Sequence, residues 1–147
     1  MIYLATDHRG FALKEKIKTW FAEWGYEYED LGANSYNEQD DYPDFIHAAA
    51  RKVSEKPTEN KAIILGGSGQ GEAMAANRHP GVRAAVYYGG PQDVIVLSRE
   101  HNDANVFSIG ASFVTEEDIK HVLKVWLITP FSHDERHVRR INKIDLP

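Results

Sequence analysis

No cysteine occurs among the 147 residues of the chain. Disulfide bonds, thiolate nucleophiles and cysteine-based zinc sites are therefore excluded, and the absence agrees with a reducing compartment. Long hydrophobic runs are also missing, and residues 1–7 reach a charge too early for a signal peptide or a membrane-spanning helix. From these absences we expect a cytoplasmic protein with no membrane contact.

An excess of basic residues is lacking as well. The chain has 22 acidic against 17 basic side chains, which gives a formal net charge of −5. General nucleic-acid binders normally show the opposite balance, so we expect no nucleic-acid partner, although local arginines still allow an anionic metabolite. With 42% apolar and 27% charged residues, the composition is typical of one globular domain over residues 1–147.

Short apolar runs alternate with amphipathic segments along the chain, which is typical of a parallel sheet built from repeated strand and helix units. Strands are predicted at 2–6, 26–31, 62–65, 84–88 and 106–109. Helices are predicted over 13–24, from Pro43 onward, and over 71–77, 91–101 and 115–127. The expected fold class is therefore α/β with a five-stranded parallel sheet.

A last amphipathic segment follows Pro130, and no strand comes after it for it to pack under. Its apolar residues Val138, Ile141 and Ile144 recur beside a basic face. A terminal helix of this kind often docks on a partner subunit, and we expect the same here.

Within this segment Arg136 and Arg140 lie four residues apart and share one helix face, as His133 and His137 are expected to do. Two such arginines suit a phosphate dianion. The histidines lack the His-Glu-x-x-His spacing and a third ligand nearby, so no metal site is predicted. The alternative for the arginines is a solvated basic face.

Ligands of open parallel sheets bind at the carboxyl ends of the strands, and we expect the polar segments 6–10, 66–72 and 98–103 there. Segment 66–72 is the strongest signal, because glycines let backbone N–H groups surround an oxyanion next to a helix N-terminus. It is no Walker loop, dinucleotide fingerprint or nucleophile elbow, since Gln70 and Glu72 break those patterns. The alternative is a tight turn whose glycines serve packing alone.

Glu72 is expected in the first turn of the helix that follows the glycine loop. The helix N-terminus stabilises the carboxylate anion of Glu72, whereas partial burial raises the pKa of this group. A general base whose pKa is set by these two opposing effects is one interpretation. An ordinary first-turn acidic residue is the other.

Asp7 and His8 cannot both point into the core after a buried strand, so at least one should face the crevice, unless Asp7 caps a helix. Segment 101–103 is read either as part of the site or as a polar helix end.

Together these residues resemble the ribose-5-phosphate isomerase B family, which includes the galactose-6-phosphate isomerase subunits. The matching motifs span nearly the whole chain: Asp7-His8-Arg9-Gly10-Phe11, Asp41-Tyr42-Pro43, Gly66 to Glu72 with Ala75-Ala76-Asn77, Ser98-Arg99-Glu100-His101-Asn102, and Arg136-His137 with Arg140. The resemblance implies a Rossmann-like, three-layer, doubly wound homodimer whose active site is completed by the neighbour's C-terminal helix. It also implies interconversion of ribose 5-phosphate and ribulose 5-phosphate without a cofactor.

Many members of that family carry cysteine at the position of Gly66, whereas a second group has glycine there and a glutamate matching Glu72. The present chain resembles the second group. The resemblance then implies that Glu72 moves a proton between C1 and C2 through an enediolate, and that His101 opens the sugar ring with Asp7. It also implies that stabilisation of the developing oxyanion and binding of the substrate involve Gly67, Ser68, Gly71, Asn102, His8, Arg136 and Arg140. Of these, His8, Arg136 and Arg140 would bind the phosphate.

Two departures from the family pattern bear on the substrate. Ser112 follows Gly110-Ala111 where the family usually has arginine, and segment 88–93 differs from the usual residues. A hexose 6-phosphate, such as that of allose or galactose, is therefore an alternative substrate. A phosphosugar-binding module without catalysis is the alternative from another class.

Overall fold

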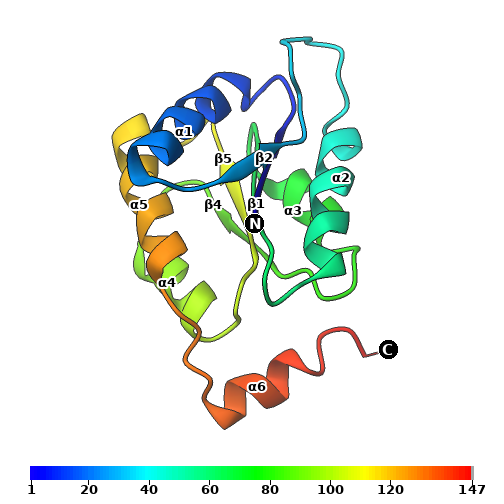
Figure 1. The fold of residues 1–147 in the computed structure, drawn as a ribbon, viewed down its shortest axis with the longest axis vertical. Coiled ribbons are helices and arrows are strands. Elements are labelled where there is room, and N and C mark those ends of the chain that lie inside the picture. Colours follow the sequence, from blue (N-terminus) through cyan, green and yellow to red (C-terminus); the bar gives the residue numbers. More distant parts are fainter. Residues whose placement is uncertain (147) are drawn as a thin grey trace.

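The computed structural model describes residues 1–146 and shows one sheet between two layers of helices (Figure 1). The strands are β1 (Ile2–Thr6), β2 (Tyr28–Asp30), β3 (Lys61–Gly66), β4 (Ala84–Tyr87) and β5 (Val106–Gly110). All pairings are parallel, and the order is β2-β1-β3-β5-β4. From β1 the chain adds β2 on one side and β3 on the other, and β4 then forms the far edge before β5 enters between β3 and β4. This confirms the Rossmann-like, doubly wound sheet and puts its switch point between β1 and β3.

The helices are α1 (Phe11–Trp24), α2 (Tyr42–Glu55), α3 (Gln70–Ala76), α4 (Asp93–Glu100), α5 (Glu116–Ile128) and α6 (Glu135–Ile141). In Figure 1, α1, α4 and α5 cover one face of the sheet and α2 and α3 the other. The sequence prediction starts α4 at residue 91, two residues before the helix begins at Asp93, with Gln92 as its N-cap. None of these helices combines the length and the apolar character that a bilayer span requires.

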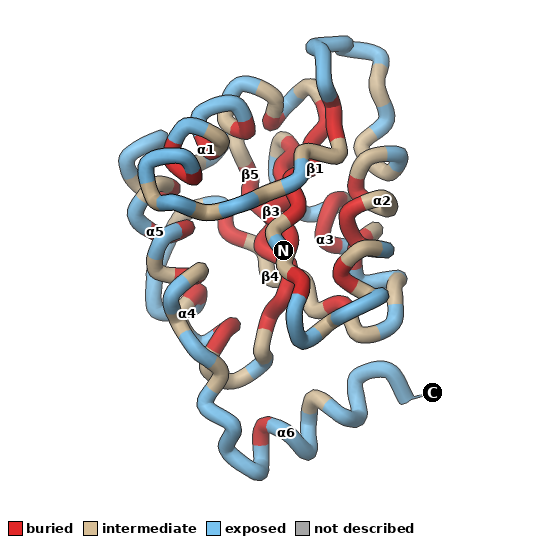
Figure 2. The backbone as a smooth tube through the Cα atoms, in the orientation of Figure 1, coloured by how far each residue is buried: buried red, intermediate tan, exposed pale blue. Residues whose placement is uncertain are grey.

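Strand β3 shows how the sheet is anchored between the two layers. Ile63 and Leu65 belong to the core under α1 and α5, whereas Ala62 and Ile64 belong to the core under α2. All four are fully buried, as the red central segments of Figure 2 show. Because successive side chains point to opposite faces, a strand covered on both sides is apolar throughout. This rigid centre positions the loops at the carboxyl ends of β1 and β3.

Helix α6 lies apart from both helical layers (Figures 1 and 2). Its connection to the domain includes a hydrogen bond of 3.1 Å from the backbone N–H of Ser132 to the carbonyl oxygen of Glu100. Only His137 of this helix is buried. The predicted helix is therefore present, but it ends at Ile141, so Ile144 lies in the turn that follows.

Candidate active site

The glycine-rich segment forms the turn between β3 and α3. Gly69 precedes the helix with a left-handed φ of 76°, and its carbonyl oxygen accepts a hydrogen bond of 2.6 Å from the Ser108 hydroxyl. Among residues 1–146, none of the hydrogen bonds outside helices and strands uses the N–H of Gly67 or Ser68 as donor. Open N–H groups beside a helix start form a cradle for an oxyanion.

Glu72 lies in the first turn of α3, as predicted, and is only 4% exposed. Burial raises the pKa of Glu72 and the negative charge of Asp7 raises it further, while the carboxylate's own backbone N–H acts in the opposite direction. Within the described part of the chain, no lysine or arginine forms an ion pair with this carboxylate. A buried carboxyl group of raised pKa suits proton transfer near neutral pH.

Asp7 and His8 extend from the end of β1 beside this loop. Asp7 is buried, and its Oδ1 accepts a hydrogen bond of 2.9 Å from the backbone N–H of Arg9. It is not the cap of α1, because that position belongs to Gly10, which has no side chain to donate or accept. His8 is half-buried at the same edge. The structure thus brings Asp7, His8 and the glycine loop together at the switch point of the sheet.

Asp40 is a residue of this edge that the sequence analysis missed. Its Oδ1 lies 2.6 Å from Nδ1 of His8 and also accepts the backbone N–H of His8 at 3.2 Å. The pair fixes the imidazole ring and leaves Nε2 as the nitrogen available to a substrate. Asp7, His8 and Asp40 place one potential metal-ligating atom each within 4.8 Å of one another, and the His8–Asp40 hydrogen bond accounts for one of these short distances. Adjacency to the Asp41-Tyr42-Pro43 motif was the only sequence signal.

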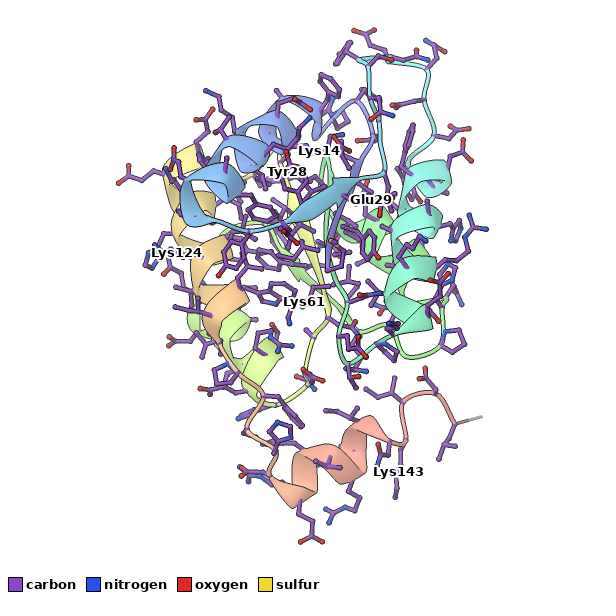
Figure 3. All side chains as sticks on the ribbon, viewed as in Figure 1. Lys14, Tyr28, Glu29, Lys61, Lys124 and Lys143 are labelled. Carbon is purple, nitrogen blue, oxygen red and sulfur yellow. The ribbon has the colours of Figure 1, made fainter. Side chains whose placement is uncertain are left out.

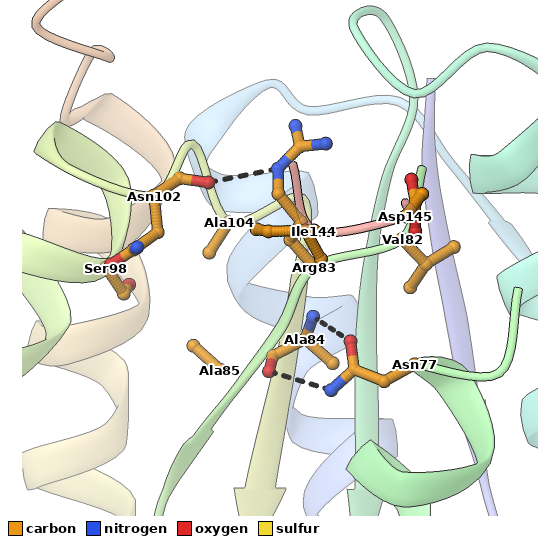
Figure 4. A pocket seen from close by; sticks show the side chains of 10 residues that line it. All are labelled: Asn77, Val82, Arg83, Ala84, Ala85, Ser98, Asn102, Ala104, Ile144 and Asp145. Carbon is orange, nitrogen blue, oxygen red and sulfur yellow. Dashed lines mark hydrogen bonds between the residues drawn. The ribbon is translucent and has the colours of Figure 1, made fainter. Parts of the chain in front are cut away.

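The expectation that segment 98–103 lies at the carboxyl edge is wrong. Helix α4 returns from the carboxyl end of β4 to the amino edge of the sheet, so the segment before β5 lies at the amino ends of the strands. There the Nε of Arg83 donates a hydrogen bond of 2.9 Å to the carbonyl oxygen of Asn102 (Figure 4). Asn102 lines a pocket with Asn77, Arg83 and Ile144.

His101 meets α6 at this amino edge. Its ring stacks on that of His137 with the ring centroids 4.2 Å apart and the planes 17° from parallel. Burial and the neighbouring His101 lower the pKa of His137. Arg136 and Arg140 lie on the same short helix. In Figure 3, Lys61 marks the amino end of β3 and Lys143 the segment after α6.

The expectation that His133 and His137 share a helix face is also wrong. Asp134 is the N-cap of α6, so His133 precedes the helix and adopts a positive φ of 59°. Its ring packs 4.7 Å from that of Phe131, measured between centroids.

The predicted site residues therefore fall into two groups within one chain. The carboxyl-edge group surrounds the glycine loop and consists of Asp7, His8, Gly67, Ser68, Gly71 and Glu72. The amino-edge group surrounds α6 and consists of His101, Asn102, Arg136 and Arg140. The two groups lie at opposite ends of the strands, so the length of the sheet separates them.

Known proteins share both the sequence pattern and the fold. A family model described as Ribose/Galactose Isomerase matches residues 2–144. The ribose-5-phosphate isomerase B of Mycolicibacterium paratuberculosis is 40% identical over 141 residues, which cover 96% of this chain and 87% of that protein. The crystal structure of ribose-5-phosphate isomerase B from Mycoplasma genitalium with bound ribulose-5-phosphate has a TM-score of 0.92 at 36% identity, covering 97% of this chain and 92% of that chain. The Thermotoga maritima enzyme has a TM-score of 0.89 at 37% identity, with 98% and 96% covered. The resemblance noted from the motifs is confirmed, and the chain belongs to the ribose/galactose isomerase family.

Proposed function

We propose that this chain interconverts ribose 5-phosphate and ribulose 5-phosphate through an enediolate, with Glu72 as the general base. Relatives of the same family carry the name ribose-5-phosphate isomerase B, and one of them has ribulose-5-phosphate bound. The observation that carries the mechanistic part is the buried carboxylate of Glu72 beside the open backbone N–H groups of the glycine loop.

The reaction moves one proton and one carbonyl group between neighbouring carbons. The carboxylate of Glu72 takes the proton from C2 of the aldose, and the electrons of that C–H bond form the C1–C2 double bond of an enediolate. Return of that proton to C1, together with transfer of the O2 hydroxyl proton to O1, leaves a hydroxyl group at C1 and the carbonyl at C2, so no net oxidation occurs. The N–H groups of Gly67, Ser68 and Gly71 stabilise the negative oxygen that develops between these steps. Neither a metal ion nor an organic cofactor is part of this proposal.

The second part of the proposal is a homodimer with shared active sites. The carboxyl-edge group and the amino-edge group lie at opposite ends of the strands. A complete site therefore needs the amino-edge group of one copy next to the carboxyl-edge group of the other. Apolar side chains beside the edge strand β4 support such an interface, since Met74, Val94 and Leu97 are exposed there. Arg136 and Arg140 of the partner subunit would then bind the phosphate together with His8.

His101 and Asn102 of the partner subunit complete this arrangement. His101 opens the sugar ring together with Asp7, and Asn102 contacts the substrate hydroxyls. Both side chains belong to the amino-edge group. They reach the proposed site through the same dimer interface that brings α6 of the partner subunit there.

The experiment is an isomerisation assay on ribose 5-phosphate with purified protein that has been treated with a metal chelator. Parent activity that survives chelation, together with a decrease of kcat by about 10²- to 10⁴-fold in Glu72→Gln, would support the proposal. Glu117→Gln is the matched control, because Glu117 is an exposed first-turn glutamate of α5. Full activity in Glu72→Gln would rule out this base.

Allose 6-phosphate is the comparison substrate in the same assay. The proposal expects a higher kcat/KM on the pentose phosphate. A preference for the hexose phosphate would leave the chemistry in place and change the substrate, whereas inactivity on both sugars would favour a binding module.

A further inference from the structure

Arg9 reaches from the loop after β1 across the carboxyl end of β3 to the loop after β5. Its Nη2 donates a hydrogen bond of 3.2 Å to the Ser112 hydroxyl. Its Nε lies 3.4 Å from the point where a Cβ on Gly67 would be. Because β3 lies between β1 and β5 in the sheet, the guanidinium is held beside the glycine loop.

The charge of Arg9 is not neutralised by a neighbouring carboxylate. No aspartate or glutamate among residues 1–146 forms an ion pair with it. The nearby Asp7 accepts the backbone N–H of Arg9 instead. A guanidinium has five N–H donors, and the neutral hydroxyl of Ser112 engages only one side of it. The remaining donors are available to an anion in the crevice.

The Arg9 side chain is exposed, and its hydrogen bond to Ser112 places the guanidinium next to the open backbone N–H groups of the glycine loop. Immobilising a long side chain costs conformational entropy, which a single hydrogen bond to an exposed serine does not readily offset. A phosphate dianion would offset it, since arginine binds phosphate through parallel, charge-assisted hydrogen bonds.

We propose that Arg9 binds the substrate phosphate from the chain that also carries Glu72, and that Ser112 positions its guanidinium. This inference rests on the proposed function, because it takes the phosphosugar as the ligand. It also accounts for the departure at Ser112, where the resembling family usually has arginine. In this chain the positive charge near position 112 comes instead from Arg9, in the loop after β1.

The test uses steady-state kinetics with ribose 5-phosphate. Arg9→Gln is expected to raise KM by about 10- to 100-fold with little change in kcat, because a hydrogen bond between charged groups is lost equally from the ground state and the transition state. The double variant Arg9→Gln/Ser112→Arg should recover most of the affinity. Arg51→Gln on the exposed side of α2 is the control and should behave like the parent.

Inorganic phosphate serves as a second probe that does not require turnover. It should raise the melting temperature of the parent and of Arg51→Gln, and raise that of Arg9→Gln much less. An unchanged KM and an unchanged phosphate effect in Arg9→Gln would overturn the inference while leaving the proposed function intact, and a decrease of kcat alone would also overturn it. Phosphate binding that depends on Arg9 in a protein without isomerase activity would support the anion contact and reject the proposed function.

Discussion

The carboxylate of Glu72 occupies the space that a side chain on Gly66 would need. The glycine at the end of β3 is therefore explained by sterics rather than by its backbone angles. In the proposed mechanism, the Glu72 carboxylate can take up this position only because the last residue of β3 has no side chain. This relationship gives a physical reason for the pairing of glycine at 66 with glutamate at 72.

Substitution of Gly66 by alanine tests this relationship. We expect Gly66→Ala to displace the carboxylate of Glu72 and to lower kcat by about tenfold or more, since a misplaced base loses much of its contribution. In the background of Glu72→Gln the same substitution should cause little further loss of activity, because both changes act on one group. Additive losses in the double variant would show that Gly66 acts independently of Glu72. Circular dichroism would verify that each variant is folded.

The raised pKa of Glu72 predicts how stability depends on pH. Below the usual value of 4.5, the carboxyl group is protonated in both the folded and the unfolded chain. Above it the unfolded chain loses this proton first, so the contribution of Glu72 to stability falls until the pH passes the raised pKa of the folded state. Glu72→Gln lacks this effect and should be more stable than the parent at neutral pH.

Urea unfolding at a fixed protein concentration, repeated from acidic to neutral pH, measures this difference. The free energies of unfolding of parent and Glu72→Gln should converge below pH 4.5 and diverge above it. A difference that does not change with pH would contradict the pKa assignment.

The hydrogen bond between Asp40 and His8 predicts a separate effect on activity. Asp40→Asn replaces a charged acceptor by a neutral one, so kcat/KM should fall by about tenfold, which corresponds to the loss of one charge-assisted hydrogen bond. Glu29→Gln at an exposed position of β2 is the control. Steady-state kinetics on ribose 5-phosphate provides the measurement, and equal values for Asp40→Asn and the parent would show that His8 does not depend on this partner.

The sequence predicts the sheet and the place of Glu72 well, because both depend on local patterns. Apolar runs such as 62–65 are long enough to identify buried strands, and the glycines that follow mark the turn into α3. The prediction fails where the path of the chain decides the outcome. Segment 98–103 is polar and precedes a strand, and only the antiparallel return of α4 shows that it lies at the amino edge.

Contacts between distant residues explain the remaining misses. His8 meets Asp40 across 32 positions in the sequence, through a loop without periodicity. Arg9 meets Ser112 across 103 positions. No spacing rule connects such pairs, so the structure was needed to find Asp40 and Arg9 beside the residues of the candidate site.

The most direct test of the shared active site is complementation between two inactive variants. Glu72→Gln and His101→Ala are each expected to lack activity, since every dimer of either variant lacks one essential group in both sites. Refolding an equal mixture should restore about one quarter of the parent activity, because about half of the dimers are mixed and each has one intact site. Mixed dimers that form but stay inactive would contradict a site built from Glu72 of one chain and His101 of the other.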